Sequence, residues 1–106
     1  MKNFFLVIPT RDRIEHLSNL LLDLNAFEKN ISQVIIVDQS KESIKDKLEK
    51  LELNFTYTLI KNKRENSVNH SRNLALENYK EEEWLFFLDD DLRISGKEFE
   101  KIIFYL

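Results

Sequence analysis

The stretch FFLVIPTRDR, residues 4–13, is the starting point for predicting the fold. Its first five residues are apolar, and Pro9 and four polar residues follow them directly. A short, unbroken apolar run is typical of a strand that is covered on both faces, as in a parallel sheet. Three similar runs occur further along the chain, at residues 34–37, 55–60 and 84–88. The sequence therefore predicts four strands.

Segments with helical periodicity follow each of these runs. Their apolar stripes are Ile14-Leu17-Leu21-Leu24, Ile44-Leu48-Leu51, Val68-Arg72-Ala75-Leu76-Tyr79 and Phe99-Ile102-Ile103. Asp12, with Glu15 three residues later, is predicted to cap the first helix, and Ser40 or Ser43 the second. The capping box at residues 95–98 opens the fourth. This alternation predicts a parallel sheet with helices on its faces and right-handed crossovers.

Composition narrows the function classes. The 106 residues are 42% hydrophobic and 33% charged, as expected for one folded domain. A net charge of −3 without a basic patch argues against a nucleic-acid partner. The absence of cysteine excludes disulfides, thiol catalysis and Cys-type zinc sites. We find neither a signal peptide nor an apolar stretch of about 20 residues, and expect a cytoplasmic protein, free or at the inner face of a membrane.

Polar side chains follow all four predicted strands. They lie in residues 9–13, 38–40, 61–66 and 89–91. In parallel sheets these segments share one edge, where ligands bind in open α/β folds. The three consecutive residues Asp89, Asp90 and Asp91 repel one another, and Mg²⁺ or Mn²⁺ would offset that repulsion while bridging to phosphate oxygens. A solvated acidic turn before a helix explains these three residues equally well.

Several candidate site residues also have a purely structural interpretation. Asp38 is suited to capping the second helix. Arg72 is suited to pairing with a surface acid at the end of its stripe. Arg11 and Arg13 are interpreted as solvated loop charges, and Trp84 as a core or edge residue rather than a platform for a sugar. These alternatives stay open at the level of the sequence.

Four segments, taken in order, resemble glycosyltransferase family 2 of the GT-A type. Residues 5–13 are similar to the family's V-V-I-P-T-x-N-R strand, and residues 34–40 to its I-I-V-V-D-D-G-S strand. Residues 70–75 are similar to its A-R-N-x-G helix, and residues 87–91 to its F-L-D-x-D motif. The resemblance covers nearly the whole chain. It implies a single Rossmann-like, three-layer α/β/α domain over residues 1–106, with a mostly parallel sheet of about four strands in the order 3-2-1-4.

The resemblance also implies roles for individual residues. The nucleotide of a nucleotide-diphosphate sugar would contact Thr10, Arg11, Asp38, Gln39, Arg72 and, at the ribose, Asp90. Asp91 would bind the divalent metal, Mn²⁺ or Mg²⁺, with support from Asp89. The family reaction is inverting transfer of the sugar to a hydroxyl of a glycan, a lipid-linked saccharide or a protein.

Two departures concern the nucleotide pocket. Gln39 stands where the family often has an Asp that contacts the base, and an amide both donates and accepts hydrogen bonds, so the base stays open. Arg11 replaces an aromatic residue, and a guanidinium can also stack on a ring. A third departure is Asp12, which stands where the family commonly has an Asn.

The largest departure is length, because only residues 92–106 follow Asp91. The family's later half supplies the acceptor site and a general base, and we assign no base in this chain. We therefore expect a domain truncated relative to full family members. The alternative is a catalytically inactive domain that binds a nucleotide sugar or a protein, and whether the chain alone is an enzyme stays open. The apolar run at residues 102–106 suits packing on the sheet, pairing with a second copy, or continuation of the protein.

Overall fold

The computed structural model describes residues 4–62, 73, 76–77 and 84–94. The elements within this part of the chain are β1 (Phe4–Thr10), α1 (Ile14–Leu24), the 3₁₀ helix η1 (Asn25–Asn30), β2 (Ile31–Asp38), α2 (Lys45–Glu49), β3 (Tyr57–Lys61) and β4 (Trp84–Phe87). The four predicted strands are confirmed. The first two are longer than their apolar runs, because polar residues at their ends still pair in the sheet.

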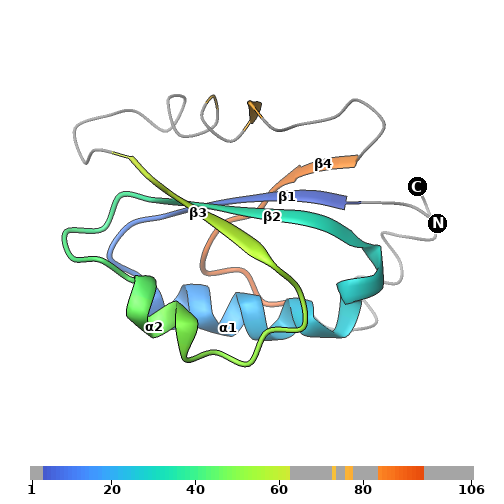
Figure 1. Ribbon diagram of the computed structural model, residues 1–106, viewed down its shortest axis with the longest axis horizontal. Coiled ribbons are helices and arrows are strands. Elements are labelled where there is room, and N and C mark those ends of the chain that lie inside the picture. Colours follow the sequence, from blue (N-terminus) through green and yellow to red (C-terminus); the bar gives the residue numbers. More distant parts are fainter. Residues whose placement is uncertain (1–3, 63–72, 74–75, 78–83, 95–106) are drawn as a thin grey trace.

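The four strands form one parallel sheet in the order β3-β2-β1-β4 (Figure 1). This is the order that the family resemblance implied. In the register of the sheet, Thr10 is the partner of Asp38, and Asp38 is the partner of Lys61. The polar ends of three strands therefore lie side by side at one edge.

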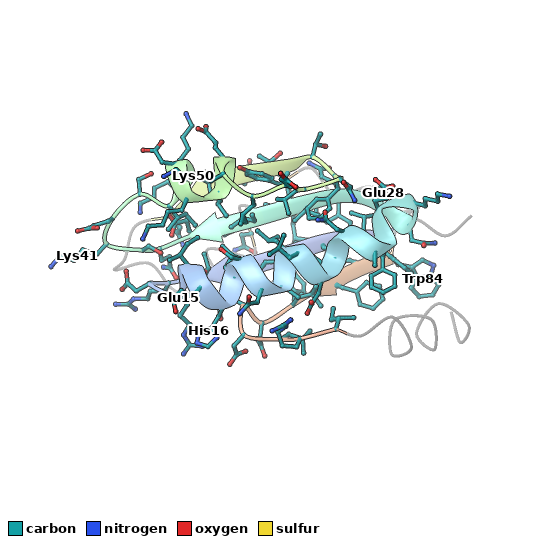
Figure 2. All side chains as sticks on the ribbon, turned by 90° about the horizontal axis from the view of Figure 1, so that it is seen from below. Glu15, His16, Glu28, Lys41, Lys50 and Trp84 are labelled. Carbon is teal, nitrogen blue, oxygen red and sulfur yellow. The ribbon has the colours of Figure 1, made fainter. Side chains whose placement is uncertain are left out.

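Both faces of the central strands are buried, which explains their unbroken apolar sequences. On one face, alternate residues of β1 and β2 pack with the leucines of α1 and with Leu48 of α2. On the other face, Phe5, Val7, Ile35 and Val37 are fully buried. Helices α1 and α2 lie on the same side of the sheet, and Figure 2 views this side from below.

The predicted caps of the first two helices are wrong, and the capping box at residues 95–98 lies outside the described residues. Asp12 lies outside α1 with φ of 54°, and its carboxylate accepts a hydrogen bond from the Lys41 N–H at 2.8 Å. The Asp12 N–H donates to Ser40 Oγ at 2.9 Å, so two predicted caps connect two loops instead. The N-cap residues are Arg13 and Ile44. Ser43 lies one residue before the second N-cap and accepts a bond from the Lys45 N–H at 3.3 Å.

Other predicted elements fall largely outside the described residues. Asn73 and Leu76 have helical backbone conformations, in agreement with the predicted third helix. The rest of that helix, the fourth helix and the apolar run at residues 102–106 are not described, and neither is a helical layer on the second face of the sheet. Among the described residues, no helix is long and apolar enough to cross a membrane.

Candidate functional site

The carboxyl edge of the sheet carries the buried polar groups of the described residues. They are Thr10, Asp38, Gln39, Ser40, Asn62 and Asp90. The sheet ladder continues past the strands and brings them together. The Gln39 N–H donates to the Thr10 carbonyl, and the Asn62 N–H donates to the Asp38 carbonyl, each at 2.9 Å. The predicted convergence of polar strand ends is therefore present.

The three consecutive aspartates have different environments. Asp90 is 7% exposed, and its Oδ2 accepts a hydrogen bond from the Thr10 hydroxyl at 2.9 Å. Asp89 and Asp91 are exposed. A bond from the Leu92 N–H to the Asp89 carbonyl at 3.1 Å closes a turn over residues 89–92, which we call the acidic turn. One carboxylate thus faces the sheet edge, while the other two are exposed on the surface.

Arg13 supplies positive charge to the acidic turn. Its Nη1 lies 3.4 Å from Asp90 Oδ1 and 3.6 Å from Asp91 Oδ2. The interpretation of Arg13 as a solvated loop charge is therefore wrong, although its side chain is half exposed. From the sequence, only a metal ion was expected to offset the repulsion among the three carboxylates. The signal that pointed to Arg13 was its place at the polar end of the first predicted strand.

Asp38 shapes the loop that follows β2. Its Oδ1 accepts a hydrogen bond from the Ser40 N–H at 2.7 Å, and its Oδ2 lies 3.6 Å from Lys61 Nζ. Lys61 also donates to the Ser40 carbonyl at 2.6 Å. Asp38 does not cap α2, because the helix begins several residues later and the carboxylate is already bonded within the loop. Sequence reasoning missed Lys61 as a site residue, although it directly follows the apolar part of the third strand.

The remaining predicted site residues lie in different places. Gln39 is buried beside Asp38, and Arg11 is exposed on the loop between β1 and α1. Arg72 lies outside the described residues. Trp84 begins β4 and is 45% exposed. In Figure 2 it lies at the opposite end of the molecule from Glu15 and His16, which mark the start of α1, so it is remote from the acidic turn.

An open cavity of about 600 Å³ adjoins the acidic turn. Its lining residues are Asp12, Arg13, Ile14, Glu15, His16 and Asp91. A second cavity of about 320 Å³ is also lined by Asp12, together with Ser40 and Lys41. Cavities of this size accommodate small molecules. The loops after β1 and β2 and the acidic turn therefore surround space that a ligand could occupy.

The residues fit a metal ion that is shared with a phosphate ligand. Among the described residues, no group of three or more His, Cys, Asp or Glu side chains could hold a metal alone. Mg²⁺ commonly binds through one or two carboxylates, with water and substrate phosphates completing its octahedron. The acidic turn presents two exposed carboxylates of this kind, those of Asp89 and Asp91.

Comparisons with known proteins concern the family and the fold of the chain. The family model described as Glycosyl transferase family 2 matches residues 5–106. The crystal structure of S. aureus TarS 1–349 superposes with a TM-score of 0.77 at 20% identity, covering 99% of this chain and 32% of that chain. The crystal structure of TarS 1–349 in complex with UDP-GlcNAc gives a TM-score of 0.72 at 21% identity, covering 99% and 31%. For the crystal structure of S. aureus TarS the TM-score is 0.73 at 20% identity, covering 99% and 19%.

At these identities the solved structures show a shared fold. The chain spans about a third or less of their length. No curated protein sequence matches it.

Proposed function

The chain belongs to glycosyl transferase family 2, and from this premise we propose that the carboxyl edge of its sheet binds a nucleotide-diphosphate sugar. The observation that carries the proposal is the acidic turn. Thr10 and Arg13 hold the buried Asp90 at the sheet edge, while the neighbouring carboxylates of Asp89 and Asp91 are exposed and Asp91 lines a cavity. A buried polar anchor next to exposed carboxylates suits a ligand with both hydroxyl and phosphate groups.

The nucleoside would occupy the loops after β1 and β2. Gln39 offers both a donor and an acceptor to a base, and Arg11 offers a planar guanidinium for stacking. Asp38 supports this pocket by fixing the loop through Ser40 and Lys61. Arg72 completes the proposed set, and Asp90 is assigned to the ribose.

The diphosphate would lie at the acidic turn with Mn²⁺ or Mg²⁺. Asp91, supported by Asp89, is proposed to hold the metal together with phosphate oxygens. When bound, such a metal neutralises charge that develops on the departing diphosphate. Asp91 is the better-placed ligand because it also lines the cavity.

The reaction proposed for the protein is inverting transfer. An acceptor hydroxyl oxygen bonds to the anomeric carbon of the sugar while the bond from that carbon to the diphosphate breaks. The electron pair of that bond leaves with the diphosphate, and the hydroxyl proton passes to a general base. We assign donor binding to this chain, and no residue in it is assigned as the base.

Titration calorimetry with UDP, dTDP and GDP, each with and without Mn²⁺, tests the proposal. UDP is the first choice, because one structure with the same fold was solved with UDP-GlcNAc. We expect binding that requires metal, and we expect Asp91→Ala to reduce it to the level seen without metal. Asp46→Ala, at an exposed position on α2, is the control and should bind like the wild type. Binding that ignores both the metal and the Asp91 substitution would reject the site.

A further inference from the structure

Asp23, near the end of α1, makes three hydrogen bonds to the chain that follows the acidic turn. Its Oδ2 accepts bonds from Arg93 Nε at 2.8 Å and from the Ile94 N–H at 3.0 Å. Its Oδ1 accepts a bond from Arg93 Nη2 at 3.1 Å. The Asp23 side chain is mostly buried although Arg93 is largely exposed.

These bonds hold the chain where it leaves the acidic turn. Residues 92–94 form no strand there, so the sheet does not hold them. Before the turn, the Leu88 N–H donates to the Val7 carbonyl and holds the chain against β1. After the turn, Arg93 and Ile94 leave the sheet and run beside α1, where Asp23 receives them. The turn is therefore held at its entry by β1 and at its exit by α1.

An ordinary surface ion pair would not have this effect. Exposed pairs contribute little to stability and leave the backbone free. Here a two-pronged guanidinium contact is combined with a backbone N–H on the next residue. Such a contact is geometrically specific, so it constrains where the backbone lies as well as the charge.

We propose that Asp23, through Arg93 and Ile94, is a positioning residue that sets the place of the acidic turn for binding the metal and diphosphate. The proposal rests on the proposed function of that turn. Asp23 touches neither ligand; it acts by fixing the exit of the segment that carries Asp91. Groups that orient metal ligands from outside commonly change affinity by about 10- to 100-fold when removed.

A matched control lies two residues away. Asn25 Nδ2 donates to the Glu52 carbonyl at 2.8 Å, and its Oδ1 accepts a bond from the Asn54 N–H at 2.7 Å. Asn25 thus fastens the segment before β3 in the way that Asp23 fastens the segment after β4. Asn25→Ala removes a comparable set of bonds from the same end of α1 without touching the acidic turn.

The experiment compares Asp23→Ala, Arg93→Ala and Asn25→Ala in calorimetric titrations with Mn²⁺ and UDP, at a temperature where circular dichroism shows each variant folded. Arg93→Ala removes the two guanidinium bonds and leaves the bond from the Ile94 N–H, so the proposal can still be tested if Asp23→Ala fails to fold. We expect the Asp23 and Arg93 variants to bind about 10- to 100-fold more weakly, and Asn25→Ala to bind like the wild type. Equal affinity in all three variants would overturn the proposal.

Amide hydrogen exchange of Leu92, followed by NMR without any ligand, separates this inference from the proposed function. The Leu92 N–H closes the acidic turn, so we expect faster exchange in Asp23→Ala and Arg93→Ala but not in Asn25→Ala. If the wild type binds no nucleotide but the Asp23 and Arg93 variants exchange faster, the proposed function is rejected while the positioning role of Asp23 is supported. Unchanged exchange in the Asp23 and Arg93 variants would reject the positioning role of Asp23.

Discussion

At the scale of the residue, the acidic turn shows how the fold gives identical side chains different tasks. Asp90 is buried and bonded to Thr10, whereas its two neighbours are exposed. A buried carboxylate needs hydrogen-bond donors to offset its lost hydration. Thr10 and Arg13 supply them at this position. Asp90 is therefore a structural anchor as well as a proposed contact for ribose.

Thr10→Val should destabilise the protein, because it removes the hydroxyl donor while keeping the shape of the side chain. We expect a loss of about 1–3 kcal/mol in the free energy of unfolding, the usual cost of leaving a buried acceptor without its partner. Urea denaturation followed by circular dichroism measures it. Thr58→Val, at an exposed position on β3, is the control and should change stability by about 0.5 kcal/mol or less. Equal stability of the two variants would show that the Thr10 bond contributes nothing measurable.

At the scale of the element, α1 organises the site from both of its ends. Arg13, its N-cap residue, contacts the acidic turn, and Asp23, in its last turn, contacts the segment beyond it. The buried leucines of α1 fix the helix on the sheet. The helix can therefore act as a rigid support, because core packing holds it independently of the site.

The Asp23 contact should make stability depend on pH. The hydrogen bond from Arg93 lowers the pKa of the Asp23 carboxyl, outweighing burial, which acts in the opposite direction. Because the folded pKa lies below the ordinary value of about 4, the stabilisation is fully present above that value and is lost as the pH falls through the folded pKa. Denaturation of the wild type and of Asp23→Asn from pH 7 down to pH 2 should show curves that converge at low pH.

Asn25→Ala provides the comparison, since the residue it removes does not titrate. Its difference in stability from the wild type should stay constant over the same range of pH. A gap between the wild type and Asp23→Asn that stays equally constant would show that the carboxylate charge does not stabilise the fold.

At the scale of the whole molecule, the site belongs to the edge where the loops after β1 and β2 meet the acidic turn. Segments up to 80 residues apart in sequence are bonded there. These segments are close together only in the folded chain, so a ligand that contacts all of them would bind the folded state and not the unfolded state. Ligand binding and stability should therefore be linked.

The melting temperature should rise when UDP and Mn²⁺ are added together and should change little with either one alone. Saturation at 100 times the dissociation constant stabilises a folded protein by about 2.7 kcal/mol. Differential scanning fluorimetry measures the shift, and Asp91→Ala should abolish it. A shift of equal size with UDP alone would argue against a metal shared with the diphosphate.

The sequence by itself determined the strands, the first two helices and the meeting of polar residues at one edge. The strands follow from unbroken apolar runs, because a strand buried on both faces needs them. The helices follow from their periodicity, and the shared edge follows from the alternation of strands and helices along the chain. The order β3-β2-β1-β4 came from the family resemblance, since the residues alone do not specify which strands are neighbours.

Only the tertiary structure decided which partners the polar residues take. Asp12 and Ser40 looked like helix caps, yet they bond to each other's loops. The bond from Arg93 to Asp23 spans 70 residues, and nothing in the local sequence of either residue indicates it. The physical reason is range: periodicity reports the faces of single elements, whereas hydrogen bonds between loops depend on how packed elements place their ends in space.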